Sequence, residues 1–369
     1  MKTPFVIGIS GSIGSGKSLV RHLLALRGVL TIDADELTHL LMLKGKAGYM
    51  AVLQIFGDRI LTSDGAVERG KLGQIVFHDP QELQKLEEAI HPLVAKTVRA
   101  ILQQTTCPLV AIEAIKLYSS ELLSFVNSRW FITASREVQF DRLAQTRGMS
   151  REMILERVNQ QPFPQRLQID HVIENNQQIE DSWERVEQVW LKMLENQAAF
   201  RSAVNKLAEK IPAVFLDIPQ IARMESDKYW FDKSFMPVEN GDVLQQHLLQ
   251  NRIFLTPLHE DDAYLFWRFD HFNVIIEDIS HPSSEKAIIA GISAIEAIAA
   301  CWGANCVIVQ TSKERAHCEV LSGQGYRRVS LKDKGAFPFL QFGVSFEGTM
   351  ETLFIKQLPA GIWRLIPER

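Results

Sequence analysis

The chain has 369 residues, of which 46% are hydrophobic and 23% charged, and its formal net charge at pH 7 is −4. This composition excludes a disordered or fibrous chain, and 40 basic residues against 44 acidic ones, without a block of like charges, exclude nucleic-acid binding driven by bulk charge. The length predicts two domains, each large enough to bury its own apolar core.

The chain opens with a predicted strand, a glycine-rich loop and a helix. Apolar residues dominate 3–10, glycines follow, and apolar residues recur at helical spacing over 19–26. A second apolar run at 29–32 ends in two aspartates, and helical spacing resumes at Leu37. This order predicts a βαβ start.

The same alternation continues as far as residue 200. Strands are expected at 109–112, 130–133 and 170–175, and helices at 80–103, 137–146 and 179–200. Because strands separated by helices pair in parallel, the first part of the chain is predicted to be an α/β domain with a parallel sheet.

The composition changes after a loosely patterned stretch, which we interpret as a linker over 206–230 between a first domain at 1–205 and a second at 231–369. The second domain is also predicted to be α/β. Its expected elements, in chain order, are strands at 263–270 and 273–279, a helix at 287–302, a strand at 305–310, a short helix at 314–323 and strands near 326–330 and 339–346.

One motif carries specific chemistry. The residues GSIGSGKS fit GxxxxGK[ST] and stand between the first strand and the first helix, where a phosphate-binding loop must lie. The backbone N–H groups of such a loop, together with the positive end of the helix dipole, form an anion site. Lys17 would neutralise the terminal phosphates and Ser18 would bind Mg²⁺. The residues predicted to bind nucleotide are therefore Gly11, Ser12, Ile13, Gly14, Ser15, Gly16, Lys17 and Ser18.

Asp33 and Asp35 follow the second strand, whose carboxyl end faces the same crevice as the loop in an open parallel sheet. Phosphoryl transfer to a hydroxyl needs a carboxylate to take or orient the proton, and a second carboxylate can hold the metal. The competing interpretation is that Asp35 only caps a helix that begins at Glu36. We expect capping by one aspartate and chemistry by at least one.

The first 200 residues resemble the dephospho-coenzyme A kinase family. The resemblance rests on the order and spacing of several short motifs, of which the phosphate loop alone is specific. The motifs are GSIGSGKS, IDAD, Phe56-Gly57, Asp64-Gly65 with Arg69, His91-Pro92, Arg142-Leu143, Arg147-Gly148 with Arg151, and DHVIENN from Asp170 to Asn176.

The resemblance implies transfer of the ATP γ-phosphate to the ribose 3′-hydroxyl of dephospho-CoA, the last step of coenzyme A synthesis, with ATP and Mg²⁺ as cofactors. It places Asp33 and Asp35 on the family's acidic pair, with Asp35 our choice of base and Asp33 beside Ser18 at the metal. It places Arg69 on the acceptor side and Arg142 and Arg147 on a helical lid over ATP.

Several of these residues also have a purely structural interpretation. Arginines on a helix are most often solvated partners of nearby acids, so we interpret Arg151 and Arg157 as surface or lid-packing residues and keep Arg147 first and Arg142 second as catalytic candidates. His91 precedes a proline and is as often a structural hydrogen-bonding residue as a contact to the acceptor.

The segment after the third strand departs from the family. Many members carry Pro-Leu-Leu there, whereas this chain has Glu113-Ala-Ile-Lys116-Leu117. The change alters the expected acceptor pocket, and Lys116 could instead meet an acceptor phosphate.

The second domain, most clearly from 274 to 330, resembles the later half of a GNAT-type acyltransferase. That family binds the CoA pyrophosphate with a loop of the form Arg/Gln-x-x-Gly-x-Gly/Ala at the start of its long helix. Here only Ala290 keeps the pattern, because Glu285 replaces a cation and Ile288 replaces a glycine. We therefore expect an acyltransferase-like fold without transferase activity, serving as an interaction or dimerisation module.

Two other functions compete with this prediction. One is another P-loop small-molecule kinase, and the other is a bifunctional or regulatory protein whose C-terminal domain binds CoA or acylates a partner. A small-molecule substrate is expected, with neither nucleic acid nor membrane as partner. The four cysteines show neither a CxxC pair nor metal-ligand spacing and are expected to be reduced core residues. Because no apolar window suits a leader or a membrane span, the expected location is the cytoplasm.

Overall fold

The computed structural model describes residues 3–147, 150–152, 154–155, 169–176, 178–211, 215, 219–220, 253–258, 263–270, 272–279, 285–310, 315–329, 353–359, 361 and 365–367. The chain forms two compact units. The first comprises Met1–Arg21, Leu30–Ala203 and Arg364–Arg369, and the second comprises His22–Val29 and Val204–Trp363.

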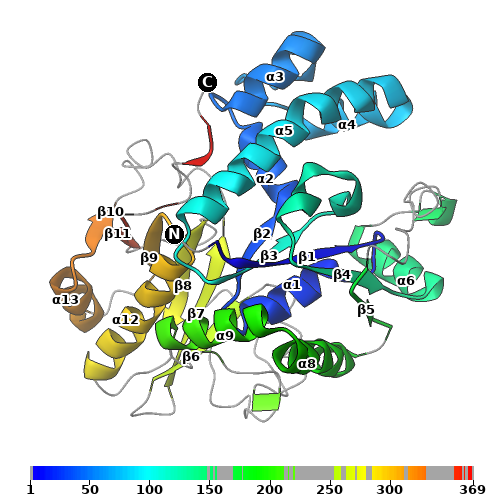
Figure 1. Ribbon diagram of the computed structural model, residues 1–369. Helices are drawn as coiled ribbons and strands as arrows, with labels where there is room; N and C mark the ends of the chain where they lie inside the picture. Colours follow the sequence, from blue (N-terminus) through cyan, green and yellow to red (C-terminus); the bar gives the residue numbers. More distant parts are fainter. Residues whose placement is uncertain are drawn as a thin grey trace. The chain divides into compact units, whose positions relative to one another are not determined.

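A five-stranded parallel sheet forms the centre of the first unit (Figure 1). Its strand order is β2-β3-β1-β4-β5, and every pairing in it is parallel. The bounds are β1 Phe5–Gly11, β2 Leu30–Asp33, β3 Leu109–Glu113, β4 Ser128–Thr133 and β5 His171–Glu174. The predicted parallel α/β architecture is confirmed.

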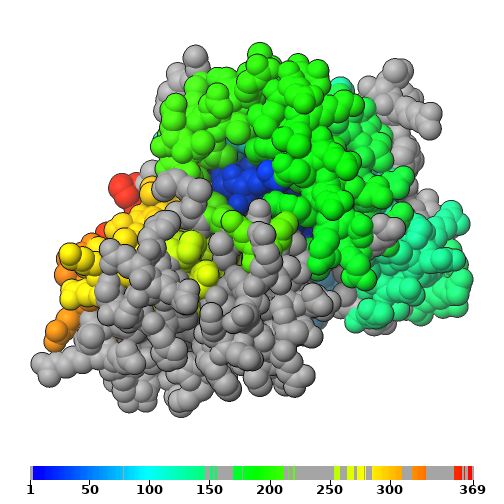
Figure 2. Space-filling view, turned by 90° about the horizontal axis from the view of Figure 1, so that it is seen from below, coloured from blue at the N-terminus to red at the C-terminus, as the bar shows by residue number. Residues whose placement is uncertain are grey.

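The central strands are buried on both faces, which explains their continuous apolar runs. All seven residues of β1 and all five of β3 are buried. In Figure 1, α2 and α5 lie on one side of the sheet and α1 and α8 on the other. Figure 2, seen from below, shows the green residues of α8 at the surface of this second side. The carboxyl ends of β1, β2 and β3 therefore carry the side chains that can face a ligand.

The helices of the first unit follow the strands in the predicted order. The major helices are α1 Lys17–Ala25, α2 Ala34–Leu41, α3 Ala47–Phe56, α4 Arg69–His78, α5 Pro80–Gln104, α6 Arg136–Arg147, α8 Ile179–Asn196 and α9 Ala198–Lys210, with short 3₁₀ turns η1 Gly57–Ile60, η2 Leu117–Ser119 and η3 Glu121–Phe125. The helices α3 and α4 are not among the elements predicted from the sequence. The two glycines of α4, RGKLGQIVFH, weaken its helical pattern.

The prediction of one helix over 179–200 is wrong in its length. The helix is interrupted at Gln197. As a result, α8 ends at Asn196, and α9 runs from Ala198 to Lys210. The guanidinium of Arg201 donates hydrogen bonds to the carbonyl oxygens of Leu194 and Glu195, at 2.7 and 2.9 Å. These bonds satisfy carbonyl groups that the end of α8 leaves without a helical partner.

A six-stranded mixed sheet, in the order β10-β11-β9-β8-β7-β6, forms the second unit. The bounds are β6 Ile253–Leu258, β7 Ala263–Asp270, β8 Asn273–Ile279, β9 Cys306–Gln310, β10 Arg327–Val329 and β11 Leu353–Gln357, with α12 Glu285–Cys301 and α13 Arg315–Gly323. The parallel pair β8 and β9 is joined through α12, while the other pairings are antiparallel.

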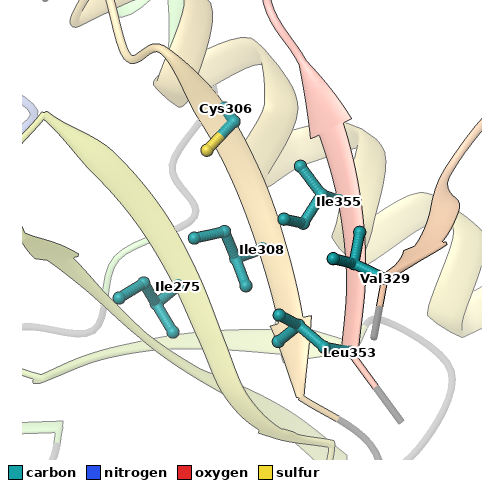
Figure 3. Packing of buried hydrophobic residues seen from close by; sticks show 6 residues of the cluster. All are labelled: Ile275, Cys306, Ile308, Val329, Leu353 and Ile355. Atoms are coloured by element: carbon teal, nitrogen blue, oxygen red, sulfur yellow. The ribbon is translucent and has the colours of Figure 1, made fainter. Parts of the chain in front are cut away.

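An apolar core joins the strands of this second sheet. Figure 3 shows side chains of neighbouring strands side by side, namely Ile275 from β8, Cys306 and Ile308 from β9, Leu353 and Ile355 from β11 and Val329 from β10. The predicted strand at 339–346 lies outside the described residues. Among the residues that are described, no helix has both the length and the apolar character that a bilayer crossing requires.

Candidate active site

The phosphate loop lies between β1 and α1, as the motif predicts. Gly16 has a φ of +86°, and a Cβ at this position would lie 1.9 Å from Nδ2 of Asn175. Both facts require glycine there, because an L side chain would meet strained backbone as well as a clash. The loop therefore adopts a shape that aims backbone groups inward, as an anion site needs.

Lys17 is buried and spans the loop. Its Nζ donates hydrogen bonds to the carbonyl oxygens of Gly11 and Ser12, at 3.0 and 3.1 Å. It is also the first residue of α1, so its ammonium group and the positive helix end act on the same small volume. This arrangement places positive charge against the loop, where phosphates would bind.

A charged network connects α1 with the carboxyl ends of β2 and β3. Glu113, the last residue of β3, is buried, and its Oε1 accepts a hydrogen bond from the Ser18 hydroxyl at 3.1 Å. Its Oε2 accepts one from Nε of Arg21 at 2.6 Å, and Nη2 of Arg21 donates to Oδ2 of Asp33 at 3.1 Å. Burial alone would lower the pKa of Arg21, but the carboxylates of Glu113 and Asp33 outweigh it and raise that pKa.

Asp33, and not Asp35, caps the helix after β2. Its Oδ1 accepts hydrogen bonds from the backbone N–H groups of Asp35 and Glu36, each at 3.0 Å, and α2 begins at Ala34. The hypothesis that Asp35 caps a helix starting at Glu36 is therefore wrong. Both oxygens of Asp33 are engaged, one by the cap and the other by Arg21, whereas the side chain of Asp35 is exposed.

Asn175, just after β5, holds the loop to the predicted lid helix α6. Its Nδ2 donates to the carbonyl oxygen of Ser15 at 3.0 Å, and its Oδ1 accepts from Nη2 of Arg142 and from the hydroxyl of Ser182, at 3.1 and 2.8 Å. Burial lowers the pKa of Arg142. Arg142 therefore reaches the loop through Asn175.

A second contact of α6 reaches the loop. Nε2 of Gln139 donates to the hydroxyl of Ser12 at 2.8 Å and to the carbonyl oxygen of Ala134 at 3.0 Å. Beside it, Ile13 of the loop packs against Leu143 and Ile154. Arg147 is the last residue of α6, but its side chain is outside the described part of the structure.

The three residues predicted on the acceptor side lie on or next to α4 and α5. Arg69 is the first residue of α4. The pKa of His39 on α2 is lowered mainly by burial and also by the positive charge of Arg69. His91 lies within α5, and its pKa is lowered mainly by partial burial, which favours the neutral imidazole. The ammonium group of Lys116 is half-exposed and forms an ion pair with Glu87 of α5, at 2.5 Å.

Four residues of this arrangement, Arg21, Glu113, Gln139 and Asn175, are not among those that the sequence predicts at the phosphate loop. Arg21 stands one turn after Ser18 on α1, and Glu113 ends a strand at the edge of the sheet where ligands bind, so both positions carried a usable signal. Gln139 and Asn175 are neutral, and only the fold brings them to the loop.

The residues present fit a magnesium site of the kind that relies on nucleotide phosphates. Within the described part of the chain, no three histidine, cysteine, aspartate or glutamate side chains converge on a common point. The described structure also gives the buried hydroxyl of Ser15 no hydrogen-bond partner. Mg²⁺ commonly takes few protein ligands and completes its shell with phosphate oxygens and water, and Ser18 could supply one such ligand.

The sheet of the first unit is parallel, a GxxxxGK[ST] loop joins β1 to α1, and α6 contacts this loop through Gln139. These features define a P-loop kinase fold. A family model described as dephospho-CoA kinase matches residues 5–181. A dephospho-CoA kinase of Dehalococcoides mccartyi is 37% identical over 175 residues, which cover 46% of this chain and 88% of that protein. The chain belongs to the dephospho-CoA kinase family.

Other relatives are also similar over about half of the chain. A dephospho-CoA kinase of Carboxydothermus hydrogenoformans is 33% identical over 186 residues, which cover 49% of this chain and 90% of that protein. Among solved structures, the protein TT1252 from Thermus thermophilus is 29% identical, with a TM-score of 0.47, and the match covers 52% of this chain and 99% of that one.

Proposed function

We infer that this chain is an ATP-dependent kinase that phosphorylates the ribose 3′-hydroxyl of dephospho-CoA to give coenzyme A and ADP. The observation that carries this conclusion is a phosphate loop with Lys17 folded across it, in a chain of the dephospho-CoA kinase family. In the reaction, the 3′-oxygen forms a bond to the γ-phosphorus while the bond from that phosphorus to the β,γ-bridging oxygen breaks.

The loop and the lid helix would stabilise the charge that spreads over the moving phosphoryl group. We assign binding of the triphosphate to the backbone of residues 11–18 and to Lys17, whose ammonium group can exchange its two carbonyl partners for phosphate oxygens. Arg142 already lies at the loop through Asn175. We also assign Arg147 to this task, because it ends the same helix.

Asp35 is our choice for the general base that takes the proton of the 3′-hydroxyl. The structure supports this choice over Asp33, because one oxygen of Asp33 accepts the backbone hydrogen bonds of the α2 cap and the other accepts one from Arg21. For the acceptor we propose Arg69, His91 and Lys116 as binding residues. Lys116, whose own side chain is half-exposed, would have to leave its partly buried partner Glu87.

Mg²⁺, when bound with ATP, would neutralise charge on the β- and γ-phosphates and orient them. We propose that the Ser18 hydroxyl is its protein ligand. Asp33 is our candidate for the nearby carboxylate, and it would act through water because its own oxygens are engaged.

The decisive experiment for the kinase activity is a substrate panel with the full chain, ATP and magnesium. ADP release should be fast with dephospho-CoA and at least about 100-fold slower with shikimate, gluconate or nucleosides, because the acceptor pocket must contact the whole substrate. Preference for one of those other acceptors would assign the chain to another small-molecule kinase activity.

For the rest of the chain we propose a GNAT-like domain over 231–369 without transferase activity, joined to the kinase domain over 1–205 by residues 206–230. The order of strands supports the fold, since parallel β8 and β9 flank α12 and the late strand β11 is inserted between β9 and β10. Glu285, exposed at the first turn of α12, and the buried Ile288 support the loss of activity, because neither helps to bind a pyrophosphate.

Acetyl transfer tests this second proposal. The full chain is incubated with acetyl-CoA and a panel of amines and peptide N-termini. Free CoA thiol should appear no faster than it does in the same mixture without the protein. Release that depends on both enzyme and amine would show that the domain is an active transferase.

A further inference from the structure

One face of α6 lies against three successive residues of the phosphate loop. Nε2 of Gln139 donates to the hydroxyl of Ser12 at 2.8 Å, and Leu143 packs against Ile13. A Cβ at Gly14, where φ is +74°, would lie 3.1 Å from Cγ of Leu143 and 3.2 Å from the carbonyl oxygen of Gln139. The glycine thus allows a close approach that a larger residue would prevent, and the loop fits closely against this face of the helix.

The side chain of Gln139 is the polar link in this contact. It is only 5% exposed, and its amide nitrogen donates to the hydroxyl of Ser12 and to the carbonyl oxygen of Ala134, at 2.8 and 3.0 Å. A glutamine amide has two N–H hydrogens, so both are used. Ala134 lies between β4 and α6, so this one amide group connects the start of the lid helix with the loop.

Arg142 lies on the same face of α6 as Gln139. It follows Gln139 by three residues, which is a spacing that makes two side chains neighbours on a helix. Its Nη2 donates to Oδ1 of Asn175, whose Nδ2 donates in turn to the carbonyl oxygen of Ser15. A cation stabilises the charge of a transferred phosphoryl group most when its position is fixed before the reaction begins. The position of α6 on the loop therefore bears on what Arg142 can do.

We propose that Gln139 is a positioning residue for phosphoryl transfer. By joining α6 to Ser12, it fixes the position of Arg142 relative to the phosphate loop. This proposal rests on the proposed kinase function, since Arg142 is assigned to the phosphoryl group that moves. Gln139 acts without touching the nucleotide, because both of its amide hydrogens are held by the protein. Its removal should slow turnover without weakening the binding of a nucleotide that lacks the γ-phosphate.

A double-mutant cycle between Gln139 and Arg142 tests the proposal. The kcat with ATP, magnesium and dephospho-CoA is measured for the full chain as wild type, Gln139→Met, Arg142→Ala and the double variant. Methionine is also a long, unbranched side chain, but it provides no N–H donor. We expect Gln139→Met to lower kcat about 10- to 100-fold when Arg142 is present, and less than about twofold when residue 142 is already alanine.

ADP binding separates this role from a purely structural one. The affinity for ADP in the presence of magnesium is measured by calorimetry for the wild type and for Gln139→Met. Because ADP lacks the γ-phosphate, its Kd should change less than about threefold while kcat falls.

Gln84→Met is the matched control. Gln84 is an exposed residue of α5, and its amide donates to the carboxylate of Glu88 at 2.8 Å. The control therefore removes the same amide group from a surface contact between two residues of one helix. Both kcat and the Kd for ADP should stay within about twofold of the wild type, because such pairs contribute little.

Three results would overturn the proposal. They are a wild-type kcat in Gln139→Met, an equal fold-loss of kcat with and without Arg142, and a loss of ADP affinity as large as the loss of kcat, which would show that Gln139 only maintains the loop. If Gln139→Met does not fold, Gln139→Asn, which is one methylene shorter, enters the same cycle with the same criteria. A wild type that binds ADP but does not phosphorylate dephospho-CoA would instead contradict the proposed function.

Discussion

The two units bury polar groups in different ways. In the described residues, the buried charged side chains are those of Lys17, Arg21, Lys46 and Glu113, and all four belong to the first unit. The second sheet buries neutral polar side chains, those of Thr256, Asn273 and Asn305, beside an interior of aromatic and aliphatic residues.

This difference shows where chemistry can be inferred from structure. A buried charge needs a partner, and in the first unit the partners of Arg21 and Lys17 lie at the carboxyl ends of strands, around a loop that suits phosphate. In the second sheet Trp267 and Phe254 stack at a ring distance of 4.5 Å, and the Trp267 indole donates to the hydroxyl of Thr256. Such contacts stabilise a core and do not define a reaction.

Lys17→Ala should give the largest effect, because Lys17 is a buried charge of the site itself. We expect kcat/KM for ATP to fall about 10³-fold or more, since a positioned cation at the transferring phosphate is lost. Steady-state kinetics measure this. Lys85→Ala, which removes an exposed lysine paired with Glu82, should stay within about twofold of the wild type. Comparable kinetics of Lys17→Ala and Lys85→Ala would remove the basis for the site.

Asp35→Ala and Asp33→Ala should separate chemistry from structure. Asp35→Ala should lower kcat about 10²- to 10⁴-fold with little change in stability, because its side chain is exposed and serves as the base. Asp33→Ala should lower the free energy of unfolding by about 1–3 kcal/mol, because the α2 cap and a partner of Arg21 are lost. Kinetics and urea titration of both variants test this, and a stability loss in Asp35→Ala without a loss of kcat would reverse the assignment.

Ile308→Ala tests the apolar character of the second unit. Ile308 is fully buried on β9, between Ile275 and Ile355 of the neighbouring strands (Figure 3). The variant should lose about 2–5 kcal/mol of unfolding free energy, and Ile308→Val about 0.5–1.5 kcal/mol. Urea unfolding followed by tryptophan fluorescence measures both. Equal stabilities of the two variants would show that this core is not packed as described.

The cysteines of the second unit should give the smallest effect, a difference in labelling alone. Burial raises the pKa of Cys306 to about 12, and its thiol donates to Oδ1 of Asn273. Because the thiolate is the reactive form, Cys306 of the folded chain should resist iodoacetamide at pH 8, while the less buried Cys318 is labelled first. Peptide mass spectrometry after timed quenching measures the order, and faster labelling of Cys306 would contradict its burial.

Local sequence was sufficient for the phosphate loop and for most strands. The motif GSIGSGKS is contiguous in sequence, and the apolar patterns of its neighbours 3–10 and 19–26 predict a strand and a helix. The same holds for β8, α12 and β9, whose bounds differ from the predicted ranges by few residues.

Contacts between segments that are distant in sequence could not be predicted from local sequence patterns. Glu113 reaches Ser18 only because β3 lies next to β1, and the order β2-β3-β1 is a property of the whole sheet. Likewise, β11 enters the second sheet between β9 and β10 although it follows both in sequence. The sequence predicted a cap by one of the two aspartates but pointed to Asp35, because a difference of one residue in the start of α2 decides which aspartate accepts the backbone hydrogen bonds.

The central claim is phosphoryl transfer to the 3′-hydroxyl of dephospho-CoA, and ³¹P nuclear magnetic resonance of the product tests it most directly. With the full chain, ATP, magnesium and dephospho-CoA, the spectrum should gain one phosphomonoester signal on the ribose 3′-oxygen for each ADP formed. ADP without a new monoester, or a phosphate on another oxygen of the acceptor, would contradict the account.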